Sequence, residues 1–279
     1  MRPTLRFARN LRQTPGTLSV AAALCVVMCV GAARAEAQLP PMGAGGVTIG
    51  HLHLTARDAD LQRRFWTVLG GVPVANGQVQ LIQLPGVYMM LRQAEPTGDM
   101  AGSSVDRFSF LVKDLQASLT KWRAAGLKIE PTAKGTEATL MAPDSVVIDL
   151  VEDKSLTVPL KMRDIHFNTT SPAETQAWYV KNFGAVPGKR GPLLTAGLPG
   201  VTLVFGKAAG AVAPTKGRAL DHIGFIIKDL EPFTKKLEAS GVTLDRPFRK
   251  LSETSNVTIA FVIDPWGTNI ELNEHLAPE

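Results

Sequence analysis

The sequence predicts an α+β fold that is assembled from four copies of one strand–helix–strand module. The first observation is a long internal repeat. Residues 106–115 read Asp-Arg-Phe-Ser-Phe-Leu-Val-Lys-Asp-Leu, and residues 221–230, which lie 115 positions later, read Asp-His-Ile-Gly-Phe-Ile-Ile-Lys-Asp-Leu. The second observation is that an alternating strand pattern followed by an amphipathic helix occurs twice in each half. A period this long indicates a duplicated domain and not a solenoid of short repeats.

Each predicted module opens with a strand, continues into a helix and closes with about three strands, the last of which follows a proline turn. Leu115, Leu119 and Trp122 fall on one face of the second helix. Gly126 and Gly241 stand where helix C-caps are expected. The four modules begin near Val47, Val105, Met162 and Ala219.

The domain boundaries follow from this repeat. The first two modules form a predicted N-terminal domain over residues 47–153, and the last two form a C-terminal domain over residues 160–276. The polar, proline-containing stretch Val151–Leu160 is the predicted linker between the two domains.

Residues 1–37 are typical of a secretory signal peptide and are excluded from the predicted fold. Four arginines precede a short apolar run from Leu18 to Val30, which is too short for a comfortable membrane span. Small residues allow cleavage after Ala35 or Ala37. We therefore expect an exported, periplasmic or secreted protein of the Sec type, with no stable membrane span after cleavage.

Cleavage changes the composition of the mature chain. Both cysteines lie in the signal segment, so the mature protein has neither a disulfide nor a thiolate ligand. Removing five arginines and one glutamate from 30 basic and 25 acidic residues leaves 25 and 24. This near-neutral balance argues against nucleic acid as a partner.

Two histidines and one glutamate recur at matching places in the repeat. His166 and His222 stand in opening strands, and Glu271 stands six residues after Pro265 in a closing strand. Two imidazoles and a carboxylate form a ligand set for a divalent metal that leaves coordination positions open. We therefore predict one divalent ion at these three residues, with zinc, manganese, iron or nickel as the candidates.

The matching positions of the N-terminal half are His51, Arg107 and Asp149. Arginine keeps its proton and cannot bind a metal, so this half is interpreted as a degenerate copy with an Arg107–Asp149 salt bridge. His51 and His53 share one strand face. They are interpreted as ordinary histidines, with a weak second metal site in this half as the alternative.

The sequence resembles the vicinal oxygen chelate (VOC) superfamily, which includes glyoxalases, bleomycin-resistance proteins and extradiol dioxygenases. The resemblance spans Val47 to about Glu274. It rests on the βαβββ repeat, on Lys-Asp-Leu after the even-numbered opening strands, and on Asp-Pro-Trp-Gly-Thr-Asn-Ile-Glu-Leu at 264–272. It implies four modules paired into two domains with curved mixed sheets, ligands from opening and closing strands, and a small-molecule substrate or ligand. The chain is expected to be a monomer or a homodimer.

The residues around the predicted ligands suggest further roles. Asn168, Asn269 and Asn273 lie on the same strand faces as the ligands and could orient a polar substrate or hydrogen-bond the ligands. Simple surface polarity is the alternative. A general acid or base is harder to name, and Glu253, in a loop before the penultimate strand, is the candidate.

The predicted activity is a metal-dependent, glyoxalase-like lyase or isomerase acting on a small oxygen-chelating substrate. Extradiol ring cleavage is less favoured, because Phe261 occupies the place of that group's tyrosine and Arg249–Ile259 holds no histidine. A non-catalytic binding protein of the bleomycin-resistance kind is the alternative from another class. An inert structural paralogue, which would bind no metal, is a third.

Overall fold

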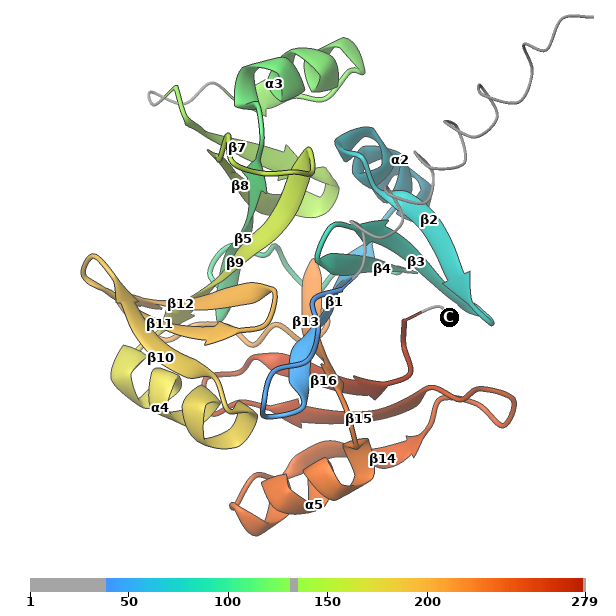
Figure 1. The fold of residues 1–279 in the computed structure, drawn as a ribbon, viewed down its shortest axis with the longest axis vertical. Coiled ribbons are helices and arrows are strands. Elements are labelled where there is room, and N and C mark those ends of the chain that lie inside the picture. The colour runs from blue at the N-terminus through green and yellow to red at the C-terminus, as the bar shows by residue number, and fades with distance from the viewer. Residues whose placement is uncertain (1–38, 131–134, 278–279) are drawn as a thin grey trace, which may run out of the picture. The chain divides into compact units, whose positions relative to one another are not determined.

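The computed structural model of the chain describes residues 39–130 and 135–277, and it repeats one module four times (Figure 1). This confirms the predicted α+β fold class. The predicted signal peptide lies outside the described residues. None of the helices in the described part of the chain has the length and apolar character needed to cross a membrane.

The bounds of the elements follow the predicted order. The first module contains β1 (Val47–Ala56), α2 (Ala59–Leu69), β2 (Val72–Asn76), β3 (Val79–Leu84) and β4 (Val87–Gln93). The second contains β5 (Val105–Val112), α3 (Leu115–Ala124), β6 (Ile129–Glu130), β7 (Glu137–Ala142), a 3₁₀ turn (Pro143–Ser145) and β8 (Val146–Glu152). The third contains β9 (Leu160–Thr169), α4 (Pro172–Phe183), β10 (Val186–Arg190), β11 (Leu193–Leu198) and β12 (Val201–Lys207). The fourth contains β13 (Leu220–Ile227), α5 (Leu230–Ala239), β14 (Leu244–Lys250), β15 (Thr258–Ile263) and β16 (Asn269–Glu274).

Local sequence explains where the helices begin and end. The side chain of Asp58 caps α2 by accepting a hydrogen bond from the Leu61 amide at 2.8 Å. Asp114 caps α3 in the same way. Gly126 and Gly241, just after α3 and α5, have φ angles of 88° and 90°. Glycine adopts this left-handed conformation without steric cost, so the predicted helix ends are confirmed.

The described strands form two mixed, eight-stranded sheets. The first sheet has the order β14-β15-β16-β13-β1-β4-β3-β2, and the second has the order β10-β11-β12-β9-β5-β8-β7-β6. In each sheet two opening strands pair antiparallel at the centre, β1 with β13 and β5 with β9. The first module is therefore joined to the fourth, and the second module to the third.

This pairing corrects the predicted domain organisation. Residues 47–153 and 160–276 mark the sequence repeat, but neither range forms a sheet by itself. The predicted linker Val151–Leu160 overlaps the end of β8 and the start of β9, which belong to one sheet. The chain passes between the sheets instead through residues 94–104 and 208–219. These two connections run beside each other, with a bridge between Ser103 and Ala213.

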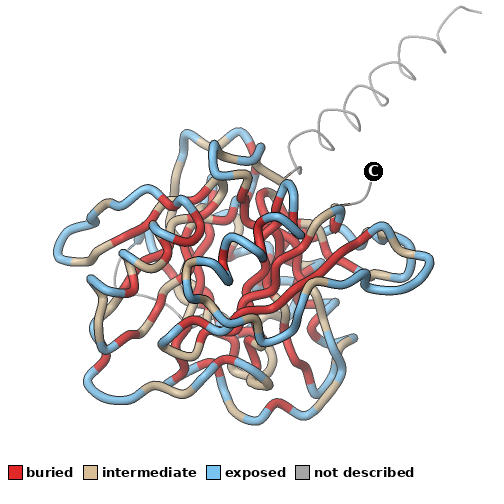
Figure 2. The backbone as a smooth tube through the Cα atoms, turned by 90° about the horizontal axis from the view of Figure 1, so that it is seen from below, coloured by how far each residue is buried: buried red, intermediate tan, exposed pale blue. Residues whose placement is uncertain are grey.

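The core lies between the sheets and the helices that cover them. Leu52 and Leu54 of β1 contribute to it together with Phe65 and Trp66 of α2, and all four are buried. Figure 2 shows buried backbone along the central strands and exposed backbone in turns and on outer helix faces. Because side chains alternate along a strand, His51 and His53 of β1 point to the opposite face, away from the helix.

Candidate metal centre

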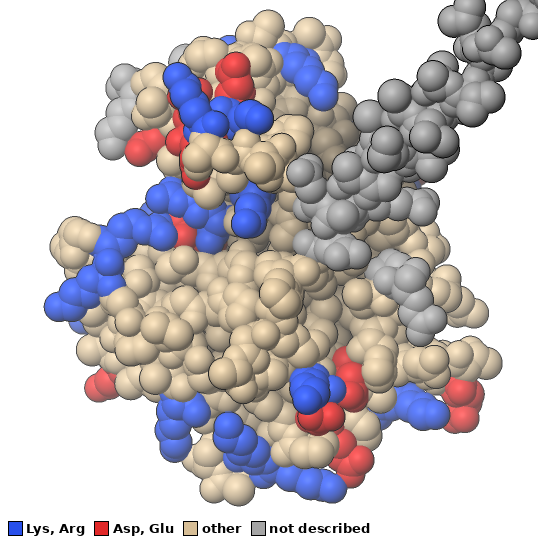
Figure 3. All heavy atoms as spheres, in the orientation of Figure 1, with Lys and Arg blue, Asp and Glu red and all other residues tan. Residues whose placement is uncertain are grey.

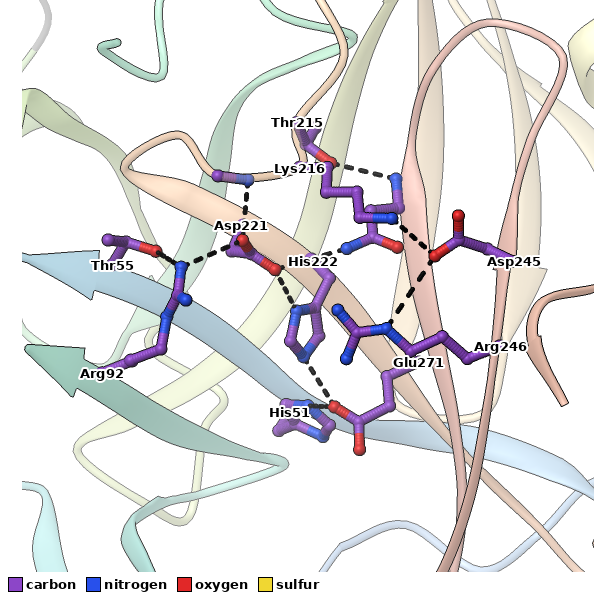
Figure 4. A network of polar contacts seen from close by, with 12 residues as sticks. His51, Thr55, Arg92, Thr215, Lys216, Asp221, His222, Asp245, Arg246 and Glu271 are labelled. Atoms are coloured by element: carbon purple, nitrogen blue, oxygen red, sulfur yellow. Dashed lines mark hydrogen bonds and ion pairs between the residues drawn. The ribbon is translucent and has the colours of Figure 1, made fainter. Parts of the chain in front are cut away.

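Four metal-ligand side chains meet on that face of the first sheet: His51 and His53 from β1, His222 from β13 and Glu271 from β16. One ligand atom of each lies within 4.8 Å of the others. The Nε2 atom of His222 is 2.7 Å from Oε2 of Glu271, and Nε2 of His51 is 3.4 Å from the same oxygen (Figure 4). The rings of His53 and His222 have centroids 4.4 Å apart.

The strand register brings these residues together. His53 lies opposite His222, and Gly224 lies opposite both His51 and Glu271. A Cβ atom at Gly224 would be 2.1 Å from the His51 ring. Only glycine at this position therefore leaves the space that the imidazole occupies, which is a reason for a glycine inside a central strand.

The unpaired imidazoles show that the residues fit a metal. Both ring nitrogens of His51 and of His53 are buried and have no hydrogen-bond partner among the described residues. Burying a polar group without a hydrogen bond costs free energy, and coordination of a cation by the neutral imidazoles would offset that cost. Burial lowers the pKa of His51, and it lowers that of His53 well below the usual value. Both rings are therefore in the neutral form that binds metals.

The other two ligand residues form a charged pair. Burial alone would raise the pKa of Glu271, but contacts with the imidazoles of His222 and His51 hold it well below its usual range. Burial alone would lower the pKa of His222, yet hydrogen bonds to Asp221 and Glu271 raise it. His222 and Glu271 therefore attract each other across a 2.7 Å contact, and the same two residues could hold a cation instead.

Neighbouring groups fix the orientation of this pair. Oδ1 of Asp221 lies 2.5 Å from Nδ1 of His222, which directs Nε2 of the ring towards the cluster (Figure 4). The side-chain amide of Asn273 donates to Oε1 of Glu271 at 2.6 Å. Asn269 donates to Asp221 at 3.3 Å. Two of the three predicted asparagines thus border the cluster.

His166 lies apart from His222 and Glu271, so the predicted set of three metal ligands is wrong for His166. It lies in β9 of the second sheet, opposite Arg107, and Asn168 lies two residues further along the same strand. The physical cause is the module pairing, because β13 lies against β1 and not against β9. His51, which occupies the matching position 115 residues earlier, stands where His166 was expected. The predicted salt bridge is present, with Arg107 Nε 2.9 Å from Asp149 Oδ2.

Glu253 is exposed in the loop between β14 and β15 and is not part of the ligand cluster. Phe261, by contrast, packs edge-on against the His222 ring at 5.4 Å between centroids. The guanidinium of Arg246 lies over Phe261 at 4.6 Å. Its only ion pair with a described carboxylate is a 4.0 Å contact to Asp245. The surroundings of His222 therefore contain an apolar ring and a cation.

Sequence reasoning missed His53 and Asp221. The 115-residue spacing between His51 and His166 could have marked His51 as a possible ligand. The glycine at position 224, inside a predicted strand, could have indicated a close approach of another residue. His53 has no histidine counterpart, since Asn168 stands at the matching place. Its role becomes visible only when β1 is known to lie beside β13.

Comparison with known proteins supports this fold. No protein-family model and no curated protein matches the chain. Among solved structures, glyoxalase I from Zea mays superposes with a TM-score of 0.66 at 15% identity, over 82% of this chain and 92% of that one. A putative dioxygenase from Bacillus subtilis superposes with a TM-score of 0.61 at 12% identity, over 86% and 87%. The chain has the fold of the vicinal oxygen chelate superfamily.

Proposed function

We propose that this protein is a metal-dependent, glyoxalase-like lyase or isomerase that holds one divalent ion through His51, His53, His222 and Glu271. The observation that carries the proposal is the set of four buried imidazole nitrogens that make no hydrogen bond among the described residues, close to the carboxylate of Glu271. Zinc, manganese, iron and nickel all accept such nitrogen and oxygen donors. One chain supplies every ligand atom, so the centre needs no second copy.

A bound divalent ion would polarise the oxygens of a small chelating substrate and acidify an adjacent C–H bond. The protein would contribute orientation and charge. Asp221 holds the His222 ring, and Asn273 holds Glu271. Arg246 over Phe261 and Arg92, which is 3.6 Å from Asp221, place positive charge around the centre. These cations favour an oxygen-rich or anionic substrate.

The apolar contact of Phe261 with His222 favours lyase or isomerase chemistry over ring cleavage. A phenyl ring cannot donate or accept the proton that a tyrosine at this place would handle. The competing class is a binding protein that uses the same site without turnover.

Exchange of carbon-bound hydrogen separates these classes. Metal-loaded protein would be incubated in D₂O with dihydroxyacetone or lactaldehyde, and deuterium next to the carbonyl would be measured by NMR. An enzyme of the proposed type exchanges this hydrogen faster than the His222→Ala variant does. A binding protein would instead give the same exchange rate as buffer alone in both proteins, and it would bind the compound only when metal is present.

We also infer export, on the arginine-rich start and the short apolar run of residues 1–37. Mass spectrometry of the protein from the producing cell would find a mature N-terminus at Glu36 or Gln38. A full-length chain that retains Met1 would refute this inference.

A further inference from the structure

The second sheet carries a cavity of about 550 Å³ in the place where the first sheet carries the ligand cluster. A volume of this order is that of a small-molecule site. The polar lining residues are Ser109, Glu137, Thr139, Asp149, Arg163, His166 and Arg190. Figure 3 shows basic side chains interleaved with acidic ones beside the hollow between β7–β8 and β10–β12.

One side of this cavity has an excess of positive charge. Asp164 is completely buried and is held by both terminal nitrogens of Arg190, at 2.5 and 2.9 Å. The Nε atom of Arg163 lies 3.2 Å from the same carboxylate. Two guanidinium groups therefore share one carboxylate. Arg163 and Arg190 both line the cavity, so their guanidinium groups can receive an anion there.

The other side of the cavity is lined by carboxylates. Arg107 is shared by Asp149 at 2.9 Å and Asp106 at 3.0 Å, so one guanidinium faces two carboxylates. Thr139 donates a hydrogen bond to Asp149 at 2.8 Å, and Glu137 lines the same side. Asp149 is about one-third exposed and can accept a further donor.

The spacing of the two sides follows from the sheet. Asp164 lies opposite Ser109, and Ser109 lies opposite Asp149 on the next strand. Two strand spacings place the backbones of the two aspartates about 10 Å apart, and their side chains shorten the gap. A molecule a few bonds long would reach from one side to the other.

We propose that this second cavity binds a small amino carboxylate, with its carboxylate at Arg163 and Arg190 and its amino group at Asp149. The arrangement matches a zwitterion at both ends, whereas a simple anion or cation would satisfy only one side. A metal is not expected here, because Arg107 occupies the position that His222 has in the first sheet. The proposal uses residues of the second sheet alone and does not depend on the proposed metal centre.

Three probes of equal chain length test the proposal by calorimetry. These are 4-aminobutyrate, butyrate and butylamine. The proposal predicts that 4-aminobutyrate binds most tightly and that Arg163→Gln weakens it by about tenfold or more, the loss expected for a charge-assisted contact. Asp149→Asn should weaken 4-aminobutyrate and leave butyrate unchanged.

Controls separate binding from folding. Arg57→Gln removes an arginine with exposed ion pairs to Glu95 and Asp144 and should leave binding unchanged. The Arg163→Gln variant should keep the native melting temperature, because Arg190 still holds Asp164. The proposal is overturned if none of the probes binds up to about 10 mM, if butyrate binds as well as 4-aminobutyrate, or if Arg163→Gln binds like the native protein.

Discussion

The two sheets present the same architecture with different chemistry at their centres. In the first sheet His222 contacts Glu271 at 2.7 Å, and in the second the matching Arg107 contacts Asp149 at 2.9 Å. The ring nitrogens of His51 and His53 make no hydrogen bond among the described residues, whereas the second sheet surrounds His166 with paired arginines and aspartates. The exchange of histidine for arginine is one difference between a cluster that could hold a metal and a network of ion pairs, because guanidinium does not give up its proton to a metal.

The neighbouring residues have diverged consistently with this exchange. Gly224 leaves room for the His51 ring, and the matching Ser109 donates a hydrogen bond to Asp164 at 3.2 Å. The residues of the histidine cluster and the residues that pack against them therefore differ together between the two sheets. Variants in each sheet can test this difference through their metal content and their stability.

The largest effect is expected from His222→Ala. This change removes one ligand and the partner of Glu271, and we expect tight divalent metal binding to be lost. Arg107→Ala, at the matching position of the second sheet, should leave metal content unchanged. Elemental mass spectrometry of both variants gives the result, and equal metal content in the native protein and His222→Ala would remove the site as described.

Gly224→Ala should disturb the cluster through packing alone. The added methyl group would lie 2.1 Å from the His51 ring, so the ring must move. We expect a loss of about 1–3 kcal/mol in unfolding free energy, the range for overpacking, together with weaker metal binding. Gly210→Ala is the control, because a methyl group there meets no described atom within 4 Å. Denaturant unfolding that gives equal losses for both variants would contradict the packing argument.

Asp221→Asn should weaken the metal without removing a ligand. Asparagine keeps the size of the side chain but loses the charge that orients His222 at 2.5 Å. We expect metal affinity to fall about 10- to 100-fold, as for other partners of ligating histidines. Competition with a coloured chelator measures the change, and an unchanged affinity would mean that Asp221 does not position the ring.

The smallest expected effect is on the pH dependence of folding stability, through His166 in the second sheet. Burial first, and then the charge of Arg107, lower the pKa of His166 to about 4. The unfolded chain therefore binds a proton between about pH 6.5 and 4 that the folded chain does not, so stability falls as pH falls through this window. After discounting for solvent at the partly exposed ring, we expect a contribution on the order of 1 kcal/mol.

Chemical unfolding at a series of pH values would detect this contribution. His166→Asn should flatten the dependence between pH 6.5 and 4. An unchanged slope in the variant would show that His166 does not titrate as described.

Sequence patterns predicted the modules well because they depend on local chemistry. Alternating strands and the glycines that end helices, such as Gly126, act within a few residues. The choice of partner module is different. Every opening strand offers the same pairing edge, so β1 can pair with β5 or β13 on local grounds alone, and the outcome depends on packing across the whole chain.

The pairing of the modules decides which of the predicted ligands lie together. His222 and Glu271 lie on adjacent strands of one module, β13 and β16, so their contact follows from the module alone. The third ligand comes from another module. The sequence placed His166 there, and the pairing of β1 with β13 places His51 and His53 there instead.

The most direct test compares His51→Ala with His166→Ala. Both variants would be purified without a chelator or an affinity metal, and their metal content would be measured by elemental mass spectrometry. The structure predicts about one equivalent of metal in the native protein and in His166→Ala, and its loss in His51→Ala. Loss of metal in His166→Ala with retention in His51→Ala would contradict the pairing of the modules and the centre built upon it.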